Sequence, residues 1–255
     1  VAGAKLRTIL EKMTKNTFVG MLVGMAFTAV VQSSSATTVL VVSFVNAGLM
    51  NLYQATGIIM GANIGTTITG QLIAFNLSDI APLFVLIGVV MLMFSKKANI
   101  QKIGEVILGF GILFVGLASM SGAMSTLKDS PVIVHMLSTL TNPFLAILIG
   151  FAITAVLQSS SATVGIVILL ASQGLLQLHI CFYIILGCNM GSCVSALIAS
   201  LGGKKNAKRA AYIHFLFNVF GSLAIVVLLQ LFMPQIEGGI MALTGSQHLT
   251  GQALH

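Results

Sequence analysis

The stretch that decides the fold is TAVVQSSSAT at residues 28–37, because it returns as TAVLQSSSAT at residues 154–163. A second pair stands at the same offset of 126 residues, GANIG at 61–65 and GCNMG at 187–191. Chance does not easily place two such pairs at one spacing. Residues 16–75 and 142–201 therefore align without a gap as an internal repeat, and the sequence predicts two homologous halves.

The composition indicates a membrane protein. Of the 255 residues, 57% are hydrophobic and 7% are charged, and the mean hydropathy is +1.05. A soluble domain carries about 25% charged residues, so this chain cannot build a water-soluble surface. The 12 Lys and Arg residues exceed the five Asp and Glu residues, but they stand in short clusters between apolar runs. This pattern is typical of cytoplasmic loops rather than of a nucleic-acid-binding surface.

The lengths of the apolar runs predict two kinds of segment. A full span needs about 20 apolar residues. Residues 18–31 and 36–47 are each too short, and the polar QSSS stretch joins them. We therefore expect a re-entrant hairpin at 17–47 and a second one at 143–173. The predicted crossings are a broken helix at 53–75 interrupted at GANIGTT, helices at 81–94 and 104–120, a second broken helix at 179–201 interrupted at GCNMGSC, and a helix at 210–233.

The basic residues support this topology. With the N-terminal cluster in the cytoplasm, the loops at 95–103 and 202–209 also become cytoplasmic, and of the 12 basic residues only Lys128 lies outside. The cytoplasmic residues are Lys5, Arg7, Lys12, Lys15, Lys96, Lys97, Lys102, Lys204, Lys205, Lys208 and Arg209. Three crossings separate the hairpins, and an odd number inverts one half relative to the other. We therefore predict an all-α membrane protein of two inverted repeats, an architecture of secondary transporters.

The predicted domains are repeat 1 at 1–95, repeat 2 at 96–233 and a polar tail at 234–255. Helix 104–120 precedes the second hairpin, and its partner in the first repeat would precede residue 1. We therefore expect the first helix of repeat 1 to lie before this chain. The sequence leaves open a homodimer and a C-terminal regulatory domain beyond residue 255.

QSSSATT at 32–38 and QSSSATV at 158–164, each followed by a GxNxG motif, resemble the type II sodium–phosphate cotransporter family, and in particular its bacterial members. The resemblance covers roughly residues 5–233. It implies sodium-driven phosphate uptake across the plasma membrane by alternating access, with the QSSS tips as the transport site. The chain departs from the pattern in its second repeat, where Ser192 and Cys193 replace the threonines of the first. This puts in doubt a sodium site that rests on a hydroxyl at position 193.

Residue chemistry points to the same sites. Serine caps helix N-termini, and such termini attract anions. We expect Ser34 and Ser160 to face a common cavity, and the predicted phosphate ligands are Gln32, Ser33, Ser34, Ser35, Gln158, Ser159, Ser160 and Ser161. The glycines around Asn63 and Asn189 are expected to let the backbone unwind and turn carbonyls toward a cation. The predicted sodium ligands are Asn63, Thr66, Thr67, Asn189, Ser192, Thr37 and Thr163.

The absence of charge inside the predicted spans favours sodium coupling. Asp79, Glu105, Asp129 and Glu237 lie at span ends or in loops, whereas a proton relay usually needs an intramembrane carboxylate or histidine. His135, His179 and His214 are isolated and are expected to be loop or interface residues. Co-bound sodium would balance the charge of the anion.

Other function classes are less consistent with the sequence. Neither hairpin contains a base that could activate a serine, so a membrane hydrolase is disfavoured and no organic cofactor is expected. A sodium-coupled symporter of a carboxylate or sulfate and a passive anion channel remain alternatives. The broken helices argue against the channel, because a pore does not require them. The expected partners are phosphate, Na⁺ and the lipid bilayer, and no nucleic acid.

Overall fold

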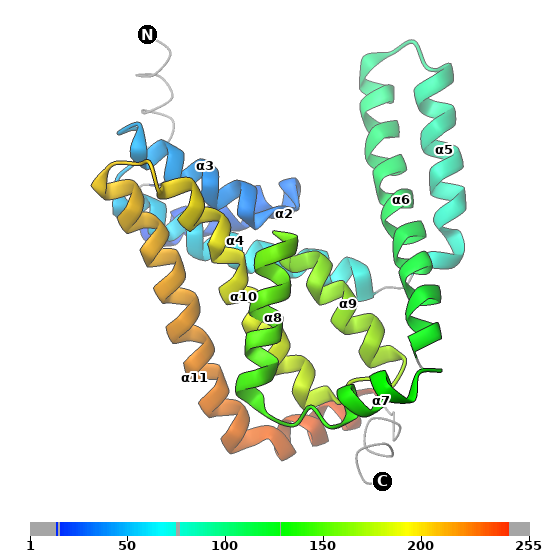
Figure 1. The fold of residues 1–255 in the computed structure, drawn as a ribbon. Helices are drawn as coiled ribbons and strands as arrows, with labels where there is room; N and C mark the ends of the chain where they lie inside the picture. Colours follow the sequence, from blue (N-terminus) through cyan, green and yellow to red (C-terminus); the bar gives the residue numbers. More distant parts are fainter. Residues whose placement is uncertain (1–13, 15, 75–76, 128, 245–255) are drawn as a thin grey trace.

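A computed structural model describes residues 14, 16–74, 77–127 and 129–244, and this part of the chain consists of helices, turns and short loops. Predictions for the N-terminal basic cluster and for Lys128 lie outside the described residues. The elements are α2 Thr17–Val31, α3 Ser34–Asn46, α4 Leu52–Ala74, the 3₁₀ turn η1 Ser78–Ile80, α5 Ala81–Phe94, α6 Ala98–Leu127, α7 Pro131–Ser138, α8 Pro143–Leu157, α9 Ser160–Ser172, α10 Leu178–Ser200 and α11 Lys205–Thr244 (Figure 1).

Each QSSS stretch forms the tip between two short helices. In the first repeat α2 ends before Gln32 and α3 begins at Ser34, and in the second α8 and α9 meet in the same way. The longest of these four helices has 15 residues, or about 22 Å at 1.5 Å per residue, so none crosses an apolar layer about 30 Å thick. The segments coincide with the two predicted hairpins, and their re-entry into a membrane remains a prediction.

The predicted interruptions of the helices at 53–75 and 179–201 are wrong. Both α4 and α10 are continuous through their GxNxG motifs. A Cβ added at Gly61 would lie 1.9 Å from the main-chain oxygen of Met21, and one at Gly187 would lie 2.1 Å from that of Ile147. The glycines therefore allow α2 to pack directly on α4 and α8 on α10, backbone against backbone, which is how small residues act between membrane helices.

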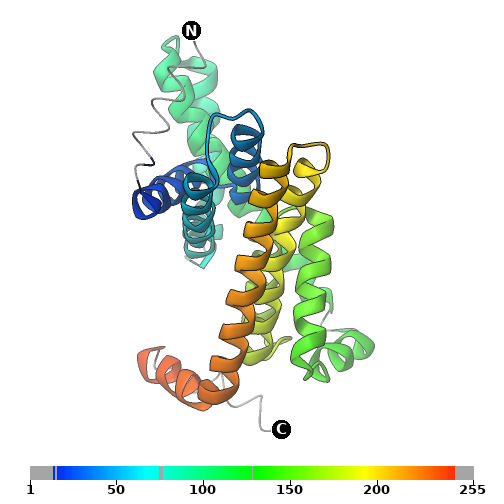
Figure 2. The same cartoon turned by 90° about the vertical axis from the view of Figure 1, so that its left-hand side faces the viewer.

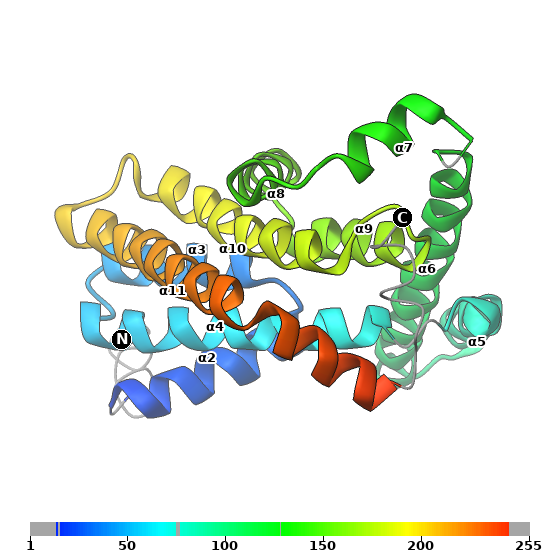
Figure 3. The ribbon, with the colours of Figure 1, turned by 90° about the horizontal axis from the view of Figure 1, so that it is seen from below.

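The two halves interlock through equivalent contacts. Besides the pairs α2–α4 and α8–α10, α3 of the first half packs against α10 and α9 of the second half packs against α4. One core lies between α3, α4, α10 and α11, with Val42, Ile59 and Ala210 among its most buried residues. Seen from below, α2 and α4 run beside each other, and α11 crosses α4 with α10 beside it (Figure 3). The orientation of each half relative to a membrane remains a prediction.

Among the described helices, α6, α10 and α11 are long and apolar enough to cross a membrane over Ala98–Ala123, Leu178–Ser200 and Lys205–Ile240. The pair α7–α8, bent by 118°, passes the same test together and is either a broken fourth span or part of a re-entrant loop. The predicted crossing at 53–75 corresponds to α4, which does not meet this criterion although it has 23 residues. The predicted crossing at 81–94 is α5, which has only 14 residues. Both crossings stay predictions.

Two helices, α6 and α11, are longer than the sequence predicts. The helix expected at 104–120 extends over Ala98–Leu127, so part of the predicted loop at 95–103 is helical. The helix expected at 210–233 starts at Lys205 and continues past Pro234 to Thr244, so the described part of the predicted polar tail is helical too. The α5–α6 pair stands beside the rest of the molecule, whereas α8, α10 and α11 lie side by side (Figure 2). The short helix α7 has no counterpart in the prediction.

Candidate functional site

The two tips share one backbone geometry. Gln32 and Gln158 adopt the left-handed conformation with φ of 58° and 55°, and each ends the first helix of its hairpin. The next residue caps the second helix, since Ser33 Oγ accepts from the Ala36 N–H at 3.1 Å and Ser159 Oγ accepts from the Ala162 N–H at 3.2 Å. The first N–H groups of α3 and α9 have no partner within their helices, as at any helix start. Each tip therefore carries free main-chain donors.

A hydroxyl on the neighbouring helix holds each glutamine in place. Thr69 Oγ1 on α4 donates to Gln32 Oε1 at 2.6 Å, and Ser195 Oγ on α10 donates to Gln158 Oε1. The glutamine Nε2 groups donate to the main-chain oxygens of the residues three positions earlier. We call these two Gln–hydroxyl pairs the tip latches. Sequence reasoning missed Thr69 and Ser195, although both are hydroxyl residues at the repeat offset of 126.

Two of the predicted sodium ligands lie inside the hairpins. Thr28 Oγ1 donates to Thr37 Oγ1 at 2.9 Å, and Thr154 Oγ1 donates to Thr163 Oγ1 at 3.0 Å. Thr37 and Thr163 each donate in turn to the carbonyl oxygen of the capping serine. Both are only 1% exposed and line neither cavity described below. In this structure they join the two arms of each hairpin.

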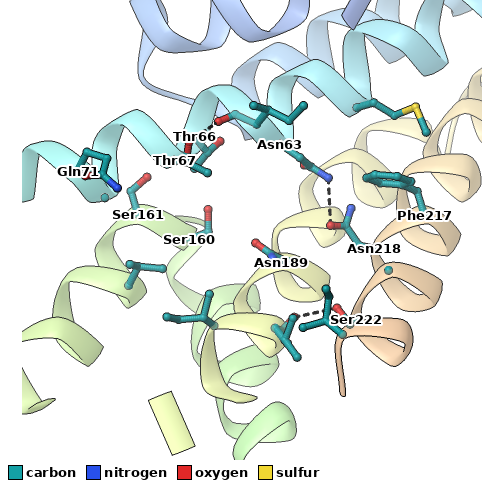
Figure 4. A pocket seen from close by; sticks show the side chains of 18 of the residues that line it. Asn63, Thr66, Thr67, Gln71, Ser160, Ser161, Asn189, Phe217, Asn218 and Ser222 are labelled. Atoms are coloured by element: carbon teal, nitrogen blue, oxygen red, sulfur yellow. Dashed lines mark hydrogen bonds between the residues drawn. The ribbon is translucent and has the colours of Figure 1, made fainter. Parts of the chain in front are cut away.

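The main cavity lies between α4, α9, α10 and α11 and has a volume of about 820 Å³ (Figure 4). Its polar wall comes from both repeats, and no acidic or basic side chain is among the residues that line it. The polar lining residues are Asn63, Thr66, Thr67, Gln71, Ser160, Ser161, Asn189, Asn218 and Ser222. Six of the predicted site residues, all outside the tip of the first hairpin, thus meet around one space: Asn63, Thr66, Thr67, Ser160, Ser161 and Asn189.

The threonines of GANIGTT present oxygen lone pairs to this cavity. Thr66 Oγ1 donates to the Ala62 carbonyl at 3.0 Å, and Thr67 Oγ1 donates to the Ile64 carbonyl at 2.7 Å. A hydroxyl has a single proton, so each oxygen is left with acceptor capacity alone. The corresponding Ser192 and Cys193 of the second repeat are buried and are not lining residues. The acceptor wall therefore belongs to the first repeat.

A second cavity of about 730 Å³ lies on the other side of the α8–α9 tip, against α6. It brings Gln32 of the first tip together with Ser159 and Ser161 of the second. Ser34 is 7% exposed and is not among the lining residues of either cavity, so a common cavity for Ser34 and Ser160 stays a prediction. Ser33 and Ser35 also lie outside both linings, as does Gln158.

Two residues of α11 that sequence reasoning did not assign to a site contact Asn63, and of the two only Asn218 lines the main cavity. Asn63 Nδ2 donates to Asn218 Oδ1 at 3.0 Å, and Asn63 Oδ1 lies 3.4 Å from His214 Nε2. His214 is 1% exposed, so it is a core residue beside the cavity rather than a loop residue. A lone histidine in an apolar run gives no signal of its partner, which stands 151 residues away in the chain.

Two capped helix starts and an uncharged polar cavity among apolar helices are consistent with a membrane transport protein. The family model described as Na⁺/Pi-cotransporter matches the chain twice, over residues 1–122 and 123–243. The chain belongs to this family, whose members transport phosphate and are not enzymes. The two matches divide the chain at a different place from the predicted boundary between residues 95 and 96, which stays a prediction.

The curated relatives agree with this assignment. The chain is 32% identical to "Uncharacterized protein YqeW" of Bacillus subtilis over 87% of its own length and 72% of that protein. It is 31% identical to "Putative inorganic phosphate export protein YjbB" of Escherichia coli over 89% of its length, but spans only 42% of that protein. A 77-residue stretch is 42% identical to "Sodium-dependent phosphate transport protein 2A" of Ovis aries, covering 29% of this chain and 12% of that protein. No solved structure matches the chain.

Proposed function

We propose that this chain is the transport core of a sodium-coupled symporter of inorganic phosphate in the plasma membrane, working by alternating access. The observation that carries the proposal is the cavity between α4, α9, α10 and α11, where donor and acceptor groups of the two repeats face one uncharged space. The family assignment supplies phosphate as the anion.

We place phosphate at the start of α9. The main-chain N–H groups of Ser160 and Ser161 are the first two of that helix, and the helix start also carries partial positive charge. The side chains of both serines line the cavity (Figure 4). Their hydroxyls make no hydrogen bond to a described residue, so they are available to an anion as donors.

We place sodium beside the hydroxyl oxygens of Thr66 and Thr67. Their hydroxyl protons are engaged with α4 carbonyls, and sodium prefers oxygen lone pairs of this kind. The carbonyls of α4 stay within the helix, so a cation there depends on side-chain oxygens rather than on unwound backbone. Since no basic residue lines the cavity, co-bound sodium also supplies the positive charge that phosphate requires.

The inequality of the two tips supports alternating access. In this structure Ser160 is open to the main cavity and its repeat partner Ser34 is buried. The reciprocal contacts of α3 with α10 and of α9 with α4 give each tip an equivalent wall in the other half. If the two tips exchanged their surroundings, the Ser34 tip would open to a cavity and the Ser160 tip would be buried in the other transport state. In that state Ser33, Ser35 and Gln32 would also approach the anion.

The test is a separation of anion affinity from sodium affinity in proteoliposomes. Ser160→Ala removes a hydroxyl donor to a charged ligand, worth about 1.5–3 kcal/mol, and should raise the apparent KM for phosphate about tenfold or more. Thr66→Val keeps the shape but removes the acceptor oxygen, so it should raise the sodium concentration for half-maximal uptake.

Matched controls exist for both variants. Ser43→Ala removes an exposed hydroxyl of α3, and Thr56→Val removes a hydroxyl of α4 that bonds Leu52 in the same way as Thr66 bonds Ala62. Neither control position lines a cavity. If Ser160→Ala and Thr66→Val transport like these controls, the assigned binding site is wrong.

A further inference from the structure

Three residues at the wall of the main cavity form a closed set of hydrogen bonds, which the main-chain oxygen of one of them completes. Asn63 lies on α4, and His214 and Asn218 lie one turn apart on α11. His214 Nε2 is 3.4 Å from Asn63 Oδ1, Asn63 Nδ2 donates to Asn218 Oδ1 at 3.0 Å, and Asn218 Nδ2 donates to the His214 carbonyl at 3.0 Å. Figure 4 shows the bond between the two asparagines. We call these three residues the Asn–His ring.

One atom fixes the direction of every bond in the ring. The main-chain oxygen of His214 only accepts, so it holds Asn218 Nδ2 and turns Asn218 Oδ1 toward Asn63. Asn218 Oδ1 is likewise only an acceptor, so Asn63 must direct its Nδ2 toward it. Asn63 Oδ1 then faces His214, and the imidazole carries its proton on Nε2. Reversing either amide would place two acceptors against each other.

Within the ring, both asparagine side-chain oxygens accept hydrogen bonds, whereas not every amide N–H group is used. Each amide nitrogen has two hydrogens, and the ring uses one of each pair, while the Asn218 amide also contacts the Cys193 thiol. Asn63 and Asn218 both line the main cavity, whereas His214 is buried behind them. The remaining N–H groups therefore belong to side chains of the cavity wall. N–H donors attract an anion, and a sodium ion needs oxygens instead.

We propose that the Asn–His ring presents Asn63 and Asn218 as N–H donors to the transported anion, with His214 as the residue that positions them. The proposal rests on the proposed function in one respect, that an anion occupies this cavity. It replaces the expected role of Asn63 as a sodium ligand. Phosphate would then lie between two sets of donors, those of the ring and those at the start of α9.

The ring joins the two halves, and the described residues contain no repeat-related copy of it. The repeat partner of Asn63 is Asn189, whose side chain is exposed and makes no hydrogen bond to a described residue. At the repeat offset His214 and Asn218 correspond to Gly88 and Leu92, which cannot build such a ring. The anion is therefore recognised unequally by two halves of similar sequence.

Asn63→Asp decides between a donor and a sodium ligand. The substitution keeps the shape and replaces Nδ2 by an oxygen that faces Asn218 Oδ1. Lost donation to a charged ligand, with added like-charge repulsion, should raise the apparent KM for phosphate at least about tenfold at saturating sodium. The sodium concentration for half-maximal uptake should stay within about twofold of wild type. A twofold shift corresponds to a much smaller free-energy change than the tenfold shift expected in the KM for phosphate. If Asn63 bound sodium, the carboxylate would instead preserve or raise sodium affinity and spare phosphate.

His214 is tested by a pair of variants. Gln carries its amide nitrogen where histidine carries Nε2, so His214→Gln should keep the donor to Asn63 and a phosphate KM near that of wild type. His214→Leu removes the donor and should raise the phosphate KM severalfold, since a hydrogen bond is lost, with less change in maximal rate. Equal behaviour of the two variants would overturn the positioning role.

A binding measurement separates this inference from the transport proposal. Thermal unfolding of purified protein in detergent should shift upward with inorganic phosphate for wild type, and not for Asn63→Asp. Wild-type protein that shows this shift but no sodium-driven uptake would refute symport and support the ring. Wild-type protein that phosphate does not stabilise, or an Asn63→Asp variant that phosphate stabilises equally, would overturn the ring as an anion-binding element.

Discussion

Gly61→Ala tests whether the GxNxG glycines serve packing. The new Cβ would lie 1.9 Å from the Met21 oxygen, whereas ordinary contacts begin at 3.4 Å, so α2 and α4 would have to separate by 1.5 Å. The atoms that the new Cβ would meet belong to the backbone of α2 and cannot rotate away. Separating the helices would also loosen the close contacts between α2 and α4 at Gly24 and Gly57. Overpacking costs about 1–3 kcal/mol, and we place this variant at the upper end. The Tm should therefore fall by roughly 6–12 °C.

The assay is thermal unfolding of purified protein in detergent, and the same helix offers a control. At Gly70 an added Cβ would meet nothing within 4 Å, so Gly70→Ala should leave the Tm unchanged or raise it, because alanine favours a helix by about 1 kcal/mol. Gly187→Ala should repeat the loss in the second half, since its Cβ would lie 2.1 Å from the Ile147 oxygen. A Gly61→Ala protein of wild-type Tm that loses only its sodium dependence would refute the packing argument and restore the unwound helix.

Two further predictions concern the tips and the topology. Thr69→Val and Ser195→Ala each remove the donor to a tip glutamine, so each should slow phosphate uptake about two- to tenfold through a loss of about 0.5–1.5 kcal/mol; uptake equal to that of Thr56→Val would show that the latches have no functional part. Single cysteines at Ser78 and Asn99 of a cysteine-free variant should be labelled from outside and from the cytoplasm respectively, and labelling of both from one face would disprove a crossing by α5.

The sequence predicted the two pairs of short helices and their tips well, because the signal there is local. A polar QSSS stretch between two apolar runs predicts a turn and a capped helix, and the structure has Ser33 and Ser159 as the caps. The same repeat offset of 126 linked the two tips before any contact was known. Local chemistry and duplication together therefore identified six of the nine polar residues that line the main cavity.

The errors came from packing, which a sequence does not state. Asparagine and glycine in an apolar helix suit both an unwound segment and a close helix contact, and Gly61 makes the contact. His214 and Asn218 form the ring because α11 crosses α4, a relation between residues about 150 positions apart. Ser34 and Ser160 are equivalent in sequence, but only Ser160 lines the main cavity, because the two halves are packed unequally here.

The central claim is that a sodium gradient drives phosphate across the membrane through this chain. The direct measurement is uptake of radiolabelled phosphate into proteoliposomes under an inward sodium gradient, with potassium replacing sodium and with a proton gradient alone as comparisons. We expect accumulation above equilibrium with sodium only, and its loss when the gradient is dissipated. Equal phosphate fluxes in sodium and potassium, without accumulation, would contradict symport and identify a passive anion pathway.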